Sequence, residues 1–180
     1  VVGSLIGGWP TDRYGRRRTL VSLGILYLVS AFWSGLAPEV YSLMIARFIG
    51  GLAIGISTVA APLYISEISP PKHRGLLTGL FQFNIVFGIL MAFLSNALMK
   101  DIGENSWRWM LGIVAIPSLI YTLMCFGIPE SPRWLLNQKK DTPEGLRVLR
   151  LINPKMTDAE IQQLADEIQA ASVSQTGSKN

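Results

Sequence analysis

Four long stretches of the sequence contain no charged residue, and they limit the possible folds more than any other feature. They cover residues 19–38, 48–66, 75–99 and 109–129, with lengths of 20, 19, 25 and 21 residues. An α-helix needs about 20 apolar residues to cross the hydrocarbon core of a bilayer. Lipid offers no hydrogen bonds to an open backbone, so helices are expected and open sheets are not. The sequence therefore predicts an all-α membrane protein.

Charged residues divide the chain into two parts. Residues 1–133 carry 16 charged side chains, and the much shorter segment 134–180 carries 12. The second density is close to that of a soluble protein, in which about 25% of residues are charged. We therefore expect a membrane part over 1–133 and a segment in water over 134–180.

The membrane part is expected to contain four complete helices and one partial helix. The chain opens without Met inside an apolar stretch that has no basic start of the kind found in signal peptides. We interpret this stretch as the second half of a helix, and the chain as a piece of a longer protein. The predicted boundaries are 1–9 for the partial helix and 19–38, 40–65, 75–99 and 108–128 for the complete ones.

Basic residues set the orientation in the membrane. The loops 10–18, 66–75 and 129–140 carry nine Lys and Arg residues, whereas the alternate loops carry two. Cytoplasmic loops are enriched in basic residues, so we expect 10–18, 66–75 and 129–180 to be cytoplasmic. The net charge of +4 comes from these short clusters, which is not the pattern of a nucleic-acid-binding surface.

The segment 134–180 reads as short amphipathic helices. Thr142, followed by Pro143, predicts the start of one helix. Thr157 and Glu160 fit the capping box of a second helix. The polar residues 172–180 are expected to be a disordered end.

Small residues suggest where helices pack together. Glycines four residues apart allow two backbones to approach closely in a bilayer. We interpret such pairs as packing sites that say nothing about a substrate. They are Gly3/Gly7, Gly51/Gly55 and Gly75/Gly79.

No catalytic constellation is present in the sequence. His73 is the only histidine and lies in a basic loop beside two prolines, and Cys125 is the only cysteine. The chain has no Cys/His pair, no glycine-rich phosphate loop and no pair of carboxylates within an apolar stretch. We expect no enzyme activity, no cofactor and no metal site.

Three polar residues in the apolar stretches are candidates for function. Arg47 follows the apolar residues 40–46, and a central Arg costs about 2.5–3.5 kcal/mol, which favours an orientation toward the helix bundle. The alternative is an Arg that extends toward the outer interface. Gln82 and Asn84 could hydrogen-bond a hydroxyl-rich ligand or join two helices, and the residues alone leave that choice open.

Charged residues of both signs mark three cytoplasmic turns. They could form ion pairs between helices, or they could form a solvated rim in which each pair contributes only about 0–1 kcal/mol. Spacing alone favours the rim. The residues are Asp12, Arg16 and Arg17 in the first turn, Glu67 and Arg74 in the second, and Glu130 and Arg133 in the third.

At these turns the sequence resembles the sugar porter family of the major facilitator superfamily. The stretch 8–17, Gly-Trp-Pro-Thr-Asp-Arg-Tyr-Gly-Arg-Arg, is similar to the superfamily's G-x-x-x-D-R-x-G-R-R loop. Residues 47–51 resemble its R-x-x-x-G segment, and residues 62–75 resemble the family's Y-x-x-E…R-G loop. Residues 129–135, Pro-Glu-Ser-Pro-Arg-Trp-Leu, are similar to the motif that follows helix six.

The resemblance implies a fold and a set of roles. The family has twelve helices in two halves, and this chain would supply the end of helix two through helix six of the N-terminal half. Gln82 matches a glutamine that hydrogen-bonds the sugar. Ile89 stands at a position that is a second glutamine in some proton-linked pentose porters and isoleucine in some hexose porters. Arg47 matches an arginine that neighbours an acid on helix one in proton-coupled members. The seven charged residues of the three turns match a cytoplasmic latch.

The expected function is therefore transport of a hexose or similar polyol by alternating access, with a proton as a possible second substrate. The expected partners are the sugar, the lipid bilayer and the remaining helices of the same protein, in a plasma or inner membrane. A transporter-like sugar receptor is the alternative. A membrane scaffold is a third interpretation, for which Arg47 and the charged turns would be unnecessary.

Overall fold

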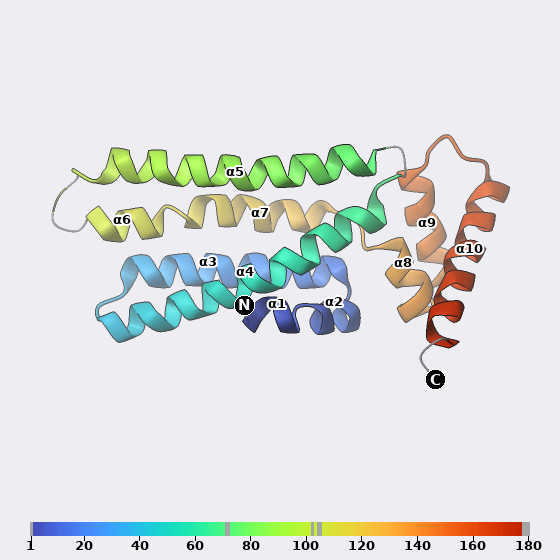
Figure 1. Ribbon diagram of the computed structural model, residues 1–180, viewed down its shortest axis with the longest axis horizontal. Coiled ribbons are helices and arrows are strands. Elements are labelled where there is room, and N and C mark those ends of the chain that lie inside the picture. Colours follow the sequence, from blue (N-terminus) through green and yellow to red (C-terminus); the bar gives the residue numbers. More distant parts are fainter. Residues whose placement is uncertain (1, 71–72, 102, 104–105, 178–180) are drawn as a thin grey trace.

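The computed structural model describes residues 2–70, 73–101, 103 and 106–177, and within these ranges it contains helices and no strand. The all-α prediction is confirmed. Most helices run roughly along the long axis of the molecule, α4 crosses them obliquely, and α8 to α10 gather at one end (Figure 1). The helices are α1 (Val2–Ile6), α2 (Gly8–Tyr14), α3 (Arg16–Leu36), α4 (Val40–Ile68), α5 (Arg74–Met99), α6 (Ser106–Gly112), α7 (Ala115–Gly127), α8 (Pro132–Trp134), the π-helical turn η1 (Leu135–Lys139), α9 (Thr142–Ile152) and α10 (Asp158–Gly177).

Four segments in the described part of the chain are long and apolar enough to cross a membrane. They are α3, α4, α5 and the segment Ser106–Gly127, which contains α6 and α7. Their mean hydropathies lie between 1.7 and 1.9. Each corresponds to one of the charge-free stretches, although α4 begins eight residues before its stretch does because the apolar residues after Glu39 continue the helix.

Small and hydroxyl-bearing residues hold α3 against α4 and α7. Ala46 and Ala53 are fully buried, and the Ser30 hydroxyl donates a hydrogen bond to the carbonyl of Ala46 at 2.7 Å. On the other side of α3, a Cβ at Gly24 would lie 2.5 Å from the Thr122 hydroxyl oxygen on α7. In a bilayer, close packing of this kind replaces the hydrophobic effect as the main force between helices.

The segment predicted as one helix over 108–128 is divided into α6 and α7. Pro117 has no N–H and cannot donate to the carbonyl of Ile113, which would be its partner in an α-helix. That carbonyl instead accepts from the N–H of Ile116 at 3.1 Å. One proline therefore explains the interruption at residues 113–114.

Only some of the glycines predicted to pack closely against another helix do so. A Cβ on Gly55 would lie 2.7 Å from the Cα of Gly3, and one on Gly7 would lie 3.2 Å from the Cα of Ile56, so α1 and α4 meet backbone to backbone. A Cβ on Gly51, Gly75 or Gly79 would meet nothing within 4 Å. Spacing alone therefore identified residues that can pack closely without showing which of them do.

Beyond Trp134, the chain forms a small helical unit with its own core. The core contains Leu136, Leu149, Ile161 and Ala165, contributed by η1, α9 and α10. The residue that caps α9 is Asp141, not the predicted Thr142, because the Asp141 carboxylate accepts from the N–H of Glu144.

The predicted start of α10 is confirmed, whereas the predicted end is wrong. The Thr157 N–H donates to the Glu160 carboxylate at 2.7 Å, as the capping box predicts. The helix then continues to Gly177, although the sequence predicts a disordered end from Ser172 onward. No glycine or proline interrupts residues 158–176, so the first residue that favours a helix end is Gly177 itself. Residues 178–180 lie outside the described residues.

Replacing Gly55 by Val should destabilise the bundle by about 1–3 kcal/mol, because backbone atoms of α1 occupy the space that the side chain needs. Gly51→Val makes the same chemical change on the same helix where the space is open, so its effect should be small. Thermal unfolding of both variants in detergent measures the difference. Equal melting temperatures would contradict the close α1–α4 contact.

Candidate functional site

A glycine turn places the first cluster of charged residues. Gly15 separates α2 from α3 with a φ of +94°, a conformation that side chains rarely adopt. A Cβ at this position would also lie 2.6 Å from the Glu130 carboxylate. The turn therefore requires glycine for two reasons, and it brings the start of α3 directly against the segment that follows α7.

Arg16 and Glu67 form a buried ion pair across this end of the bundle. Arg16 donates from Nε and Nη2 to the two carboxylate oxygens of Glu67, each at 2.9 Å. The exposed fractions of the two side chains are 9% and 7%. Paired hydrogen bonds in this planar geometry are among the strongest that side chains make. The pair joins the start of α3 to the end of α4.

The Arg16 guanidinium makes two further polar contacts. Nη2 contacts the Asp12 carboxylate at 3.1 Å, and Nη1 donates to the carbonyl of Thr11 at 3.3 Å. Asp12 differs from the other members of the cluster because 60% of its side chain is exposed. The cluster thus has a buried centre and one acid at the surface.

Ser131 is a member of the cluster that sequence reasoning missed. Its hydroxyl donates to the Glu67 carboxylate at 2.5 Å and accepts from the N–H of Trp134 at 3.3 Å, which caps α8. Ser131 is fully buried. A serine directly before a proline is a recognisable start of a helix, and that signal could have drawn attention to it.

Glu130 anchors the end of α7 to the start of α3. One oxygen of its carboxylate accepts from the backbone N–H groups of Arg17 at 2.9 Å and Ser131 at 3.0 Å. The Arg17 guanidinium donates to the carbonyl of Phe126 at 2.7 Å, across the same junction. A carboxylate on the free N–H groups of a helix start is favoured by the helix dipole.

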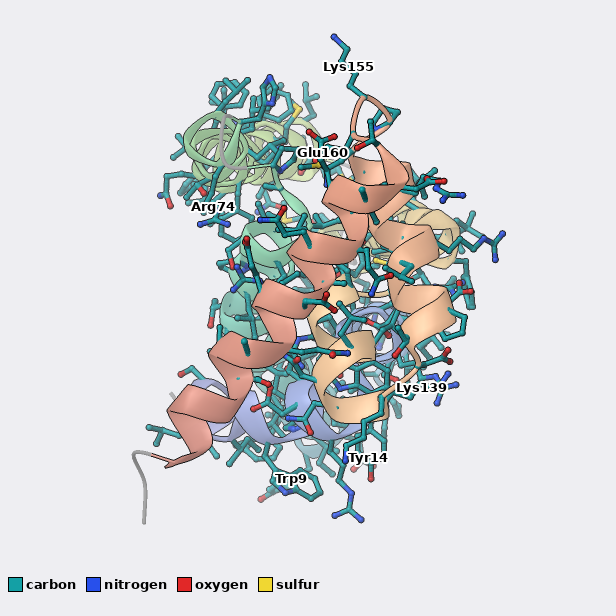
Figure 2. All side chains as sticks on the ribbon, turned by 90° about the vertical axis from the view of Figure 1, so that its right-hand side faces the viewer. Trp9, Tyr14, Arg74, Lys139, Lys155 and Glu160 are labelled. Atoms are coloured by element: carbon teal, nitrogen blue, oxygen red, sulfur yellow. The ribbon has the colours of Figure 1, made fainter. Side chains whose placement is uncertain are left out.

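Five of the seven predicted latch residues therefore meet in one region, and two do not. Asp12, Arg16 and Glu67 form one network, and Arg17 and Glu130 form a second one beside it. Arg74 and Arg133 are exposed, and neither forms an ion pair with any residue the structure describes. The solvated-rim interpretation is thus wrong for Arg16 and Glu67, whose charges are buried, and it fits Arg74 and Arg133. Arg74 lies at the edge of the end face (Figure 2).

The predicted substrate residues lie on a helix with few contacts. Gln82 and Ile89 are both exposed on α5, and α5 contains no buried residue in the described structure. In Figure 1, α5 runs beside α6 and α7 at the margin of the bundle. Gln82 and Ile89 are seven residues apart, about two helical turns, so their side chains share one face of α5.

Arg47 lies at a separate groove. It is exposed on α4 and borders a groove of about 930 Å³ whose other walls come from α5, α6 and α7, among them Phe87, Asn96 and Trp107. Neither Gln82 nor Ile89 borders this groove. No acid is among the residues that line it, so within the described chain the Arg47 charge has no partner there.

Comparison with known proteins gives consistent matches. The family model described as "Sugar (and other) transporter" matches residues 1–180. A galactose-proton symporter of Escherichia coli is 37% identical over 177 residues, which are 98% of this chain and 37% of that protein. A probable inositol transporter of Arabidopsis thaliana is 37% identical over 169 residues, 94% of this chain and 29% of that protein.

A solved structure has the same arrangement of helices. It shows the E. coli xylose transporter XylE in a partially occluded inward-open conformation, with a TM-score of 0.88 at 28% identity. The match covers 98% of this chain and 46% of that one. The chain spans about a third of the length of the curated relatives that it matches.

Replacing Arg16 by Ala should lower the free energy of unfolding by about 3–5 kcal/mol, because the Glu67 carboxylate stays buried without its partner. Arg133→Ala removes a charge from an exposed member of the same predicted set, and its effect should stay within about 0.5 kcal/mol. Chemical or thermal unfolding in a neutral detergent gives both values. A similar loss in the two variants would mean that burial of the Arg16–Glu67 pair does not matter to stability.

Proposed function

Because the chain belongs to the sugar (and other) transporter family, we propose that it is part of a secondary transporter that moves a sugar or polyol across a membrane. Family membership and the four apolar segments make the chain an integral, multi-pass membrane protein, and the family consists of transporters, not enzymes. The relatives above are named for galactose, inositol and xylose, which share a dense set of hydroxyl groups. A sugar receptor has no support among these relatives, since all are named as transporters or symporters.

The buried network around Glu67 is the observation that carries this proposal. It ties the start of α3, the end of α4 and the start of α8 together, so that these ends move as one body. Alternating access requires such bodies, because one half of a transporter rocks against the other around a central site. A solvated rim of weak pairs would not provide this rigidity.

The exposed charges supply the second part of the latch. Asp12, Arg74 and Arg133 lie on the surface, where they can pair with residues of another half of the protein. Pairs that form in one conformation and separate in the other shift the equilibrium between outward-open and inward-open states. We assign the outward-open state to the paired arrangement.

Gln82 is the residue of this chain that we propose to hydrogen-bond the sugar. A carboxamide offers two donors and an acceptor, and the exposed Gln82 side chain presents them on a face of α5 that no described residue buries. Ile89 lies two turns away on the same face and supplies an apolar contact to the ring of the sugar. An isoleucine at this position favours a hexose or polyol over a pentose.

We propose that Arg47 pairs with the carboxylate that carries the coupling proton. A carboxylate on a helix outside this chain could pair with Arg47 when ionised and release it when protonated. The E. coli relative is named as a proton symporter, which supports a proton as second substrate. The groove beside Arg47 leaves space for such a group.

Orientation follows from the basic residues. The end of the molecule with Arg16, Arg17 and Arg133 is also the end at which α8 to α10 gather (Figure 1). We place this end, with loops 10–18, 66–75 and 129–180, in the cytoplasm of a cell with the transporter in its plasma or inner membrane.

Replacing Gln82 by Ala in the transporter should weaken sugar binding by roughly three- to tenfold, the loss of about one hydrogen bond. Asn84→Ala is the matched control, because two residues place it about 200° away around α5. Uptake of labelled galactose, xylose and inositol into proteoliposomes gives the KM of each variant for each sugar. The same measurement tests whether the protein transports these sugars at all. Binding of these sugars without uptake would argue for a receptor. Neither binding nor uptake would contradict the proposal as a whole.

Replacing Asp12 by Asn should slow uptake severalfold while leaving stability nearly unchanged. The substitution removes the exposed charge but keeps the buried Arg16–Glu67 pair, so folding and latch function are separated. Initial rates in proteoliposomes, normalised to inserted protein, give the result. An unchanged rate would show that Asp12 takes no part in a latch.

A further inference from the structure

A groove with basic and apolar walls lies where α3 and α7 meet α8 and α9. Its larger part has a volume of about 820 Å³ and an adjoining part has about 560 Å³. The two parts share Arg17, Phe126, Pro129 and Glu144. Sites of 300–1,000 Å³ hold small molecules or headgroups. The proposed sugar residues Gln82 and Ile89 do not line this groove, and of the seven latch residues only Arg17 and Glu130 border it.

The apolar side of the groove belongs to the membrane. Val21 and Phe126 line it from α3 and α7, two of the segments that can cross a bilayer, and Phe126 is 54% exposed. Farther along α7, the large apolar side chains of Leu123 and Met124 are exposed as well. An acyl chain can therefore continue from the groove along the helices without leaving apolar surroundings.

Most of the charged residues that line the groove are basic. Arg17, Arg18 and Lys139 line the larger part, and Arg147 and Arg150 line the smaller part. Arg18 is exposed and forms no ion pair with any residue that the structure describes. Its guanidinium is available to a ligand.

The three acids at the groove already have partners. Glu130 accepts from two backbone N–H groups, as described above. Asp141 pairs with Lys139 at 3.1 Å and caps α9, and Glu144 pairs with Arg147 at 3.5 Å. Arg150 pairs with Asp158, an acid that does not line the groove. Five basic residues against these four acids still leave one positive charge in excess, which favours an anion.

We propose that this groove binds the headgroup of an anionic glycerophospholipid. The phosphate lies between Arg18 and Lys139, and the acyl chains follow Val21 and Phe126 into the bilayer. The Lys139 ammonium has three donors, so it can hold the phosphate and keep its contact with Asp141. Guanidinium groups bind phosphate oxygens with paired donors, and basic residues next to a membrane helix attract anionic lipid. A lipid is favoured over free phosphate because the apolar wall is continuous with the membrane surface of α3 and α7. The orientation proposed above makes this the cytoplasmic leaflet.

Native mass spectrometry of the chain in detergent, titrated with dioleoyl phosphatidylglycerol, tests the site. Each basic residue near an anionic lipid contributes about a fivefold change in binding, so Arg18→Gln with Lys139→Gln should weaken the first bound lipid about thirtyfold. The control double variant, Arg13→Gln with Lys155→Gln, removes the same charge elsewhere. Lys139 and Lys155 lie at different edges of the end face (Figure 2).

Two further arms separate the possible ligands. Dioleoyl phosphatidylcholine should bind the wild type at least tenfold more weakly than phosphatidylglycerol, and inorganic phosphate should not displace phosphatidylglycerol. Arg18→Lys with Lys139→Arg keeps both charges and should retain most of the binding. Circular dichroism of each variant checks that its helices are intact.

Several results would overturn the proposal. Equal losses in the two charge-removing variants would mean a general electrostatic attraction without a site. Equal binding of the two lipids would exclude recognition of an anion, and displacement by inorganic phosphate would indicate a phosphate site that needs no lipid. Failure of the charge-keeping variant to bind, with its helices intact, would show that these two positions act through something other than charge.

Discussion

The buried ion pair between Arg16 and Glu67 is the contact on which this end of the molecule depends. Removing two charges from water is expensive, and the cost is recovered only when every remaining hydrogen-bonding position is filled. Here the Thr11 carbonyl and the Asp12 carboxylate accept from Arg16, and the Ser131 hydroxyl donates to Glu67. Because Ser131 also caps α8, and α8 leads into η1, α9 and α10, the placement of the whole helical unit 134–177 is connected to one carboxylate in α4.

Much of the fold could be predicted because it depends on length and charge. Runs of 19 to 25 uncharged residues determine membrane helices almost regardless of context. The Arg16–Glu67 contact was among the candidates for the same reason, since charges of opposite sign at successive turns can meet. Its burial was not predictable, because burial depends on how the Gly15 turn and the Glu130 carboxylate bring α3 and α7 together, and no spacing in the sequence contains that distance.

Other features escaped prediction because they depend on single atoms. The division of α6 from α7 results from one missing N–H at Pro117, in a stretch whose composition is otherwise that of a continuous helix. Ser131 and Asp141 cap helices by hydrogen bonds that compete with those of neighbouring residues such as Thr142. The sites of sugar and proton, which depend on Gln82, Ile89 and Arg47, remain predictions, because their proposed partners include groups beyond this chain.

The lack of buried residues in α5 has a consequence for how variants of this protein can be studied. In water, a helix with its apolar residues exposed would aggregate, but in lipid those residues already have the solvent they prefer, so α5 gains little free energy from its neighbours. A melting temperature reports lost contacts, so substitutions along α5 should change it very little. A thermostability screen would therefore score substitutions in α5 as neutral, including those at the residue proposed to bind the sugar. Only assays of sugar binding or uptake would detect their effect.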